Sequence, residues 1–357
     1  MVRQRSAKSL YGGSIPPAAS MGSILVTGGC GFIGSHFVRH ILKSKPGFVV
    51  LNFDKLTYAG NPENLKDISR NKNYRFDKGD IADSKSVEKV FKSFQPEYIV
   101  NFAAESHVDR SIHGFGRDFI DTNVFGVFNL LELAKKYGIK KFLQVSTDEV
   151  YGSLSLESKK KFTEKTQYKP RSVYSASKAS GDLLAHSYFS TWQLPVVVSH
   201  CSNNYGTHQY PEKLIPYLTL RTIANKSLPL YGDGKNIRDW IHVDDHVLAL
   251  DKVLFEGVLG EVYNVGGSNE ISNIDIAKMI LDILKKPYSM IKFTADRLGH
   301  DRRYAIDDSK TKKELGWKPK FKLENMLPLT VKWYEQNPIW VRNAIKRLSV
   351  VNSHIEL

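Results

Sequence analysis

A tyrosine and a lysine four positions apart, Tyr174 and Lys178, are residues whose types and spacing could do chemistry. Residues with this spacing lie on one face of a helix. A lysine ammonium beside a phenol stabilises the phenolate and lowers the tyrosine pKa from about 10 towards neutrality. Such a tyrosine can take the proton from a sugar hydroxyl while a second group accepts the hydride. On its own the pair also fits an ordinary amphipathic surface helix, so its neighbours decide the interpretation.

Three polar residues, Thr147, Asp148 and Glu149, directly follow an apolar run at residues 142–145. In open parallel sheets ligands bind at the carboxyl ends of the strands. A threonine there can hydrogen-bond a sugar hydroxyl, and two adjacent carboxyls can divide acid and base roles if their surroundings separate their pKa values. A solvated acidic turn is the alternative interpretation of these three residues taken alone.

A glycine-rich stretch, Gly28 to Gly34, stands between an apolar run at 24–27 and a helical pattern at 33–42. Glycines at such a place let a pyrophosphate approach backbone N–H groups at the positive end of a helix dipole. Asp54 follows Gly34 by twenty residues, at the end of the next apolar run, where an acid binds the adenosine ribose. A carboxylate there repels a 2′-phosphate, so the pattern predicts NAD rather than NADP. A structural glycine turn with a chance aspartate is the alternative.

The elements that must position these residues alternate along the first part of the chain. Strands are expected at 24–27, 48–53, 98–102, 142–145 and 196–199, and helices at 33–42, 87–94, 124–137 and 174–189. Alternating strands and helices predict an α/β fold with a doubly wound parallel sheet of the Rossmann type. Continuous apolar strands indicate burial on both faces of that sheet.

After Asn203 turn residues become denser, which predicts a second, smaller region. Helices are expected at 273–285, capped by Ser272, and at 323–335. We therefore divide the chain into a tail, an NAD-binding domain to which a later strand near 261–266 returns, a mainly substrate-binding α/β domain and a C-terminal tail. Their expected ranges are 1–22, 23–203, 204–340 and 341–357.

Composition excludes several classes of protein. The 357 residues contain 51 Lys plus Arg against 37 Asp plus Glu, a net charge of +14, and 41% are hydrophobic. This is globular composition, not that of a disordered or coiled-coil chain. No apolar run approaches the ~18 residues that a membrane span needs, so no membrane partner is expected. Two cysteines, Cys30 and Cys201, exclude a disulfide framework and favour a cytoplasmic setting.

The positive charge leaves three kinds of partner open: nucleic acid, a membrane surface or a small anionic ligand. Residues 1–22 hold three of the basic residues and no acidic one, and we interpret them as a tag or disordered arm rather than a targeting segment, with Met21 suited as a start. The short clusters at 159–161 and 310–313 fit a solvated surface. A dinucleotide is itself anionic, so nucleic acid is not required.

Long ordered stretches of the chain resemble the extended short-chain dehydrogenase/reductases, and within them the NAD-dependent epimerase/dehydratase enzymes. The resemblance runs from about Ile24 to past Tyr334. The matching stretches are 54–61, 103–112, 146–152, 174–178, 201–206, 211–216, 237–240 and 296–304.

The resemblance implies dehydration of a glucose carried on a nucleoside diphosphate, with dTDP-glucose as the expected substrate. Thr147 would position the sugar hydroxyls with Tyr174, which would remove the O4 proton beside Lys178 while C4 gives its hydride to NAD⁺. Glu149 would then abstract the C5 hydrogen, and Asp148 would protonate the departing C6 hydroxyl. Return of the hydride to C6 gives a 4-keto-6-deoxy sugar nucleotide and regenerates NAD.

The resemblance also implies binding residues and a homodimer. With the glycine loop and the Tyr174–Lys178 pair, the expected NAD cleft comprises Gly28, Gly31, Phe32, Ile33, Gly34, Asp54, Lys55, Leu56, Thr57, Asp80, Ile81, Ala103, Ala104, Ser106, Thr122 and Asn204. The expected sugar-nucleotide residues are Ser106, Thr147, Asn203, Glu212, Lys213, Arg238, Asn273, Arg297 and His300. Among these Arg238 is the expected diphosphate clamp, with an ion pair to Asp239 as the alternative. The helices at 124–137 and 174–189 correspond to the family's dimer interface.

Three alternatives remain from the sequence. A 4-epimerase or related decarboxylase would share the glycine loop and the Tyr174–Lys178 pair but would not need Asp148 and Glu149. A dehydratase of a UDP-, CDP- or GDP-linked sugar is also open, because Thr207 and Leu298, like Phe102 and His200, depart from the commonest family pattern. A non-catalytic NAD-binding or RNA-associated relative could have lost these catalytic residues, and all are present.

No metal site is expected. His107 and His300 belong to no cluster with ligand spacing. Cys201 follows an apolar strand and is expected to be an inert, buried thiol.

Overall fold

The computed structural model describes residues 22–112 and 114–351. The predicted arm at 1–22 therefore lies almost wholly outside the described residues, as does the end of the predicted C-terminal tail. None of the helices in the described part of the chain has the length and apolar character that a membrane span requires.

The larger region is built on a seven-stranded, all-parallel sheet, which confirms the predicted doubly wound α/β fold. Its strands are β1 (Gly22–Thr27), β2 (Phe48–Asp54), β3 (Tyr74–Lys78), β4 (Tyr98–Asn101), β5 (Lys141–Thr147), β6 (Val196–Cys201) and β10 (Val262–Val265). The spatial order is β10-β6-β5-β4-β1-β2-β3. The direction of winding reverses between β1 and β4, and ligands bind at such a switch point.

Helices cover both faces of this sheet, which explains why its strands are continuously apolar. α1 (Phe32–Ser44) and α8 (Val243–Glu256) pack on one face through Phe37, Ile41 and Leu250. On the other face lie α2 (Ser84–Phe94), α5 (Val127–Tyr137) and α6 (Val173–Trp192). Every residue of β2 is buried as a result.

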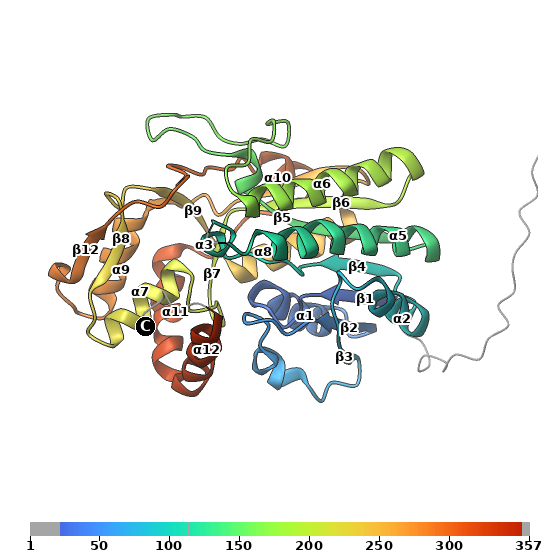
Figure 1. Ribbon diagram of the computed structural model, residues 1–357, viewed down its shortest axis with the longest axis horizontal. Helices are drawn as coiled ribbons and strands as arrows, with labels where there is room; N and C mark the ends of the chain where they lie inside the picture. Colours follow the sequence, from blue (N-terminus) through green and yellow to red (C-terminus); the bar gives the residue numbers. More distant parts are fainter. Residues whose placement is uncertain (1–21, 113, 352–357) are drawn as a thin grey trace, which may run out of the picture.

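The smaller region lies beside the end of the sheet that carries the ligand edge (Figure 1). It contains a mixed sheet of β7 (Asn203–Tyr205), β9 (Ile237–His242) and β11 (Glu270–Ser272), and a parallel pair of β8 (Leu228–Tyr231) and β12 (Ile291–Thr294). Its core joins Trp240 to residues of α7 (Leu214–Ile223), α9 (Asn273–Ile283) and α11 (Leu323–Gln336). Ser272 caps α9 by accepting a hydrogen bond from the Asp275 N–H, as its sequence position predicts.

Two segments cross between the regions. β10 comes late in the chain but pairs with β6 of the large sheet. α12 (Pro338–Val351) begins at the end of the predicted 204–340 domain and continues into the predicted C-terminal tail. It forms because Trp340, Ala344 and Leu348 bury against Tyr58 and neighbouring aromatic rings. The division of the chain near residue 203 stays a prediction.

Short helical turns complete the described chain. They are η1 (Pro62–Ile68), α3 (Val108–Ile112), α4 (Gly116–Ile120), η2 (Asp121–Gly126), η3 (Asp148–Tyr151), η4 (Tyr288–Met290) and α10 (Ser309–Leu315). η2 is a single π-helical turn that leads directly into α5, so the helix expected at 124–137 begins irregularly.

Candidate active site

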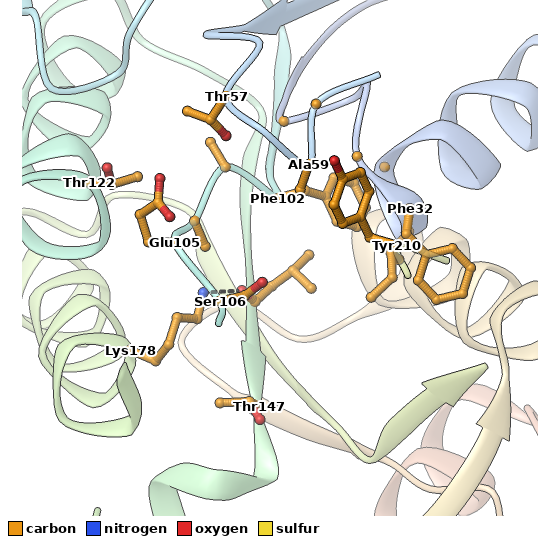
Figure 2. Close-up of a pocket in the computed structure, with 18 of the residues that line it drawn as sticks. Phe32, Thr57, Ala59, Phe102, Glu105, Ser106, Thr122, Thr147, Lys178 and Tyr210 are labelled. Atoms are coloured by element: carbon orange, nitrogen blue, oxygen red, sulfur yellow. Dashed lines mark hydrogen bonds between the residues drawn. The ribbon is translucent and has the colours of Figure 1, made fainter. Parts of the chain in front are cut away.

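A cavity of about 330 Å³ opens at the carboxyl ends of β1, β2, β4, β5 and β6, on the switch-point edge of the sheet. Figure 2 shows Phe32, Ala59 and Tyr210 gathered on one side of it, with Thr147 and Lys178 on the other. Among the residues predicted to hold NAD only Leu56 does not line the cavity. Of those predicted for the sugar nucleotide, Ser106, Thr147, Asn203, Glu212 and Lys213 line it.

The glycine loop has the geometry that a close backbone approach requires. Gly28 has a φ of +68°, and a Cβ there would lie 2.6 Å from the Ala103 nitrogen. A Cβ on Gly34 would lie 2.4 Å from the Gly28 carbonyl oxygen. α1 then begins at Phe32 with no side-chain cap and no acidic residue in its first turn. Its first N–H groups therefore suit the pyrophosphate of NAD.

Asp54 is fixed at the end of β2 by two backbone hydrogen bonds. Its Oδ2 accepts from the Cys30 N–H at 2.9 Å and its Oδ1 from the Leu56 N–H at 2.8 Å. Burial raises the pKa of this carboxyl, and the two N–H groups act in the opposite direction. Leu56, although outside the cavity lining, therefore helps to orient the carboxylate that would receive the ribose hydroxyls.

The loop that follows Asp54 is braced by α12, a contact that sequence reasoning missed. Arg347 donates from Nη1 to the Gly60 oxygen at 2.7 Å, and Trp340 donates from Nε1 to Asn64 at 2.8 Å. The Tyr210 hydroxyl, at the cavity wall, donates to the Ala344 oxygen at 2.9 Å. The C-terminal helix thus holds the wall of the cleft on its NAD side.

We expect Arg347→Ala to weaken NAD retention by about three- to tenfold, because loss of a typical hydrogen bond costs about 0.5–1.5 kcal/mol. The measurement is the NAD bound per chain after extended dialysis. Arg342→Ala is the matched control, since Arg342 is exposed on the same helix. Equal NAD content in the two variants would contradict a bracing role for α12.

Two helix caps position the reacting side chains. Thr147 ends β5 and caps η3 by accepting the Glu149 N–H at 3.3 Å, which places both carboxyl residues in the first turn of η3. Ser172 and Ser175 form a capping box at the start of α6, so Tyr174 lies in its first turn and Lys178 one turn later. Lys178 donates from Nζ to the Val145 oxygen at 2.7 Å (Figure 2).

The structure corrects the expected effect of Lys178 on Tyr174. Burial, followed by the charge of Glu149, raises the pKa of the Tyr174 phenol well above its usual value, and a hydrogen bond with Thr147 acts in the opposite direction. The Lys178 ammonium is itself buried, which lowers its pKa, and its hydrogen bond runs to the strand carbonyl. Burial and Glu149, not Lys178, therefore dominate the phenol pKa.

The two carboxyls differ in the way that acid and base roles require. Burial and the neighbouring Glu149 raise the pKa of Asp148 well above its usual range. Burial also raises the pKa of Glu149, but Arg297, Arg238 and Lys213 act against that rise. Asp148 is 2% exposed, whereas Glu149 is partly exposed. Asp148 therefore suits a proton donor and Glu149 a proton acceptor.

Side chains at the sugar-nucleotide end form a polar cluster. The Glu212 carboxyl accepts a hydrogen bond from the Tyr58 hydroxyl at 3.0 Å and lies 3.9 Å from His107 Nε2. Lys213 donates from Nζ to the Ser106 oxygen at 2.9 Å. Tyr58 and His107 lie within the matching stretches 54–61 and 103–112, but the sequence assigned neither a role in substrate binding.

Four predicted substrate residues, Arg238, Asn273, Arg297 and His300, do not line this cavity. The guanidinium of Arg238 donates to the Ile237 and Asp301 oxygens at 2.8 and 2.9 Å. Asp239 instead accepts from the Gly267 and Asn269 N–H groups, so the alternative ion pair is wrong. Since Arg238 and Arg297 lower the pKa of Glu149, they lie near the catalytic end, and their substrate roles stay predictions.

The described residues contain no group of His, Cys, Asp and Glu side chains that could hold a metal ion. Cys201 is a free, buried thiol at the cavity wall, and burial raises its pKa to about 12. A thiol of that kind is not a nucleophile at neutral pH.

Comparison with known proteins places the chain among sugar-nucleotide enzymes. The family described as GDP-mannose 4,6 dehydratase matches residues 25–330. The dTDP-glucose 4,6-dehydratase of Salmonella typhimurium is 48% identical over 344 residues, which cover 90% of this chain and 95% of that protein.

Two solved structures of dTDP-glucose 4,6-dehydratases, both with NAD, are similar along nearly their whole length. The one from Bacillus anthracis has 50% identity and a TM-score of 0.84, covering 90% of this chain and 99% of that one. The one from Streptomyces venezuelae has 43% identity and a TM-score of 0.87 with the same coverage.

Proposed function

The chain belongs to the NAD-dependent epimerase/dehydratase family, and from this membership and the geometry of the cavity we propose that it dehydrates dTDP-glucose to the dTDP-linked 4-keto-6-deoxy sugar. One observation favours dehydration over the other reactions of this family. Asp148 and Glu149 line the same cavity as Tyr174 and the glycine loop, and their environments separate their pKa values.

The residues divide the reaction into balanced steps. The Tyr174 phenolate takes the O4 proton of the sugar, which Thr147 orients. The resulting C4 ketone acidifies the C5 hydrogen, and Glu149 removes it. Asp148 gives its proton to the C6 hydroxyl, which leaves as water. NAD, held by the glycine loop and Asp54, would supply the hydride chemistry, acceptance from C4 and return to C6, and the positive charge of its oxidised ring would favour the phenolate form of Tyr174.

An epimerase of the same family is the second candidate, because it shares the glycine loop and the Tyr174–Lys178 pair. Inverting C4 needs only removal and return of a hydride, so it has no use for an acid whose pKa is raised by burial. The buried Asp148 beside Glu149 therefore favours elimination.

The test is incubation of the purified protein with dTDP-glucose without added NAD. We expect a product with the alkali-induced absorbance of a 4-keto-6-deoxy sugar, because NAD is regenerated in each cycle. UDP-, CDP- and GDP-linked glucose and GDP-mannose form the comparison set. Absence of that product with every sugar nucleotide would exclude a dehydratase, and preference for another nucleotide would reassign the substrate.

We also propose that the protein is a homodimer, formed through α5 and α6. Large apolar side chains are exposed on these two packed helices and the turn before them, with Phe125, Leu183 and Trp192 each more than half exposed. An exposed apolar surface of this kind marks an interaction site. The cytoplasmic setting expected from the cysteine count stays a prediction.

Light scattering of the parent protein at micromolar concentration is expected to give the mass of a dimer. Leu183→Glu is expected to give the mass of a monomer, because the substitution would bury a charge in the proposed interface. Leu329→Glu is the control, since Leu329 is equally exposed on α11. A monomeric parent protein, or an unchanged mass for Leu183→Glu, would contradict this interface.

A further inference from the structure

The proposed reaction leaves the catalytic groups with an unequal proton balance. Tyr174 gains the proton of O4. Glu149 gains the C5 proton and gives one back to C5 when the hydride returns to C6. Asp148 loses its proton to the departing water. Each turnover therefore ends with one proton too many on Tyr174 and one too few on Asp148, and one proton must pass between them before the next.

The Thr147 hydroxyl lies between these two groups. It donates to Asp148 Oδ1 at 3.5 Å and is also the hydrogen-bond partner of the Tyr174 phenol. Its position is fixed, because the same oxygen accepts the Glu149 N–H as the cap of η3 and because threonine is stiff at χ1. A hydroxyl can accept a proton from one neighbour while it donates its own to another.

Apart from the cavity that the proposed substrate fills, Asp148 has few routes to a proton donor. Asp148 is 2% exposed, and its Oδ2 is buried with no hydrogen-bond partner among the described residues. Lys178 points its ammonium at the Val145 oxygen, on the side of Asp182, so it does not connect the two catalytic groups. Glu149 begins and ends the cycle with the same number of protons.

We propose that the Thr147 hydroxyl carries the proton from Tyr174 to Asp148 between turnovers. The Tyr174 O–H bond breaks as the Thr147 oxygen accepts the proton, and the Thr147 O–H proton passes to the Asp148 carboxylate. Thr147 is unchanged at the end, and the step needs no oxidant or reductant. This role rests on the proposed function and adds to substrate positioning, since it acts after the product has formed.

The experiment compares single-turnover and steady-state rates of the NAD-loaded enzyme with dTDP-glucose. Thr147→Val is expected to give a burst of about one product per active site, followed by a steady-state rate at least tenfold below the burst rate. Thr147→Ser keeps the hydroxyl and is expected to show no burst. Higher concentrations of a small buffer acid such as imidazole should raise the steady-state rate of Thr147→Val and leave its burst rate unchanged.

The relay would be overturned if Thr147→Val lowered the burst rate and the steady-state rate by the same factor, or if it lowered neither of them. Buffer rescue distinguishes loss of the relay from a folding defect. In a misfolded site the buffer acid would not raise the steady-state rate while leaving the burst rate unchanged. If Thr147→Val does not fold, Thr147→Ala, which also lacks the hydroxyl, is expected to show the burst, and absence of a burst in that variant counts against the relay. Failure of the parent protein to turn over dTDP-glucose would instead be a failure of the proposed function.

Discussion

Replacing Glu149 by glutamine is expected to stop the reaction after C4 has been oxidised. Glutamine has the same shape but cannot take the C5 proton. A positioned base contributes about 10²–10⁴-fold to a rate, so we expect product formation to fall by about that factor. Because Tyr174 and Thr147 are intact, oxidation at C4 still proceeds and enzyme-bound NADH accumulates. Rapid mixing with dTDP-glucose, followed by NADH absorbance and by the product assay, separates the two steps.

The pH dependence of elimination gives this prediction a second readout. Burial raises the pKa of Glu149, so its basic form is populated only above a raised pKa. The elimination rate should therefore rise with pH through that value, and Glu149→Gln should abolish this rise. At higher pH the rate should fall again as the more strongly raised Asp148 loses its proton.

Glu105→Gln is the matched control for Glu149→Gln. Glu105 lines the same cavity and is buried, but it pairs with Arg110 at 2.9 Å and hydrogen-bonds through its backbone to Asn123, on the cofactor side. Turnover within a few fold of the parent is expected for it. Near-parental turnover of Glu149→Gln, or no NADH on mixing, would contradict the assignment of Glu149 as the C5 base.

The parts of the fold that sequence predicts are those set by local patterns. Buried parallel strands are continuously apolar, so β1, β2, β4, β5 and β6 can be recognised in the sequence as apolar runs. Ser272 can be recognised as a helix cap because its hydrogen-bond partner is only three residues away. β3 was missed, because it is an edge strand with a mostly polar sequence and its Phe76 side chain is exposed.

Contacts between residues far apart in sequence escape local reasoning. The bond from Arg347 to Gly60 joins positions 287 apart, and the Arg238 guanidinium is held by a carbonyl 63 positions away. The pKa of Tyr174 was predicted in the wrong direction for the same reason. The spacing to Lys178 is local, but the burial that dominates the phenol is produced by the whole cavity.

Replacing Tyr174 by phenylalanine is expected to stop the reaction one step earlier than Glu149→Gln, before any NADH forms. The variant loses only the hydroxyl, and its ring keeps the edge contact with Phe119, whose centroid lies 6.3 Å away. The fold should therefore persist, with a thermal midpoint close to that of the parent. The rate of NADH formation should fall by about 10²–10⁴-fold, the contribution of a general base.

The decisive observation is which of the two substitutions, Tyr174→Phe or Glu149→Gln, stops the reaction at the earlier step. Tyr174→Phe combined with Glu149→Gln should behave as Tyr174→Phe alone, because the first block prevents the state in which the second acts. Tyr168→Phe is the control, since Tyr168 is partly buried and its hydroxyl hydrogen-bonds with His200, away from the cavity lining. If the double variant accumulated NADH at the rate of Glu149→Gln, another group would have to take the O4 proton. Lys178 is poorly placed for it, because its ammonium donates to the Val145 oxygen and would first have to lose that bond and a proton.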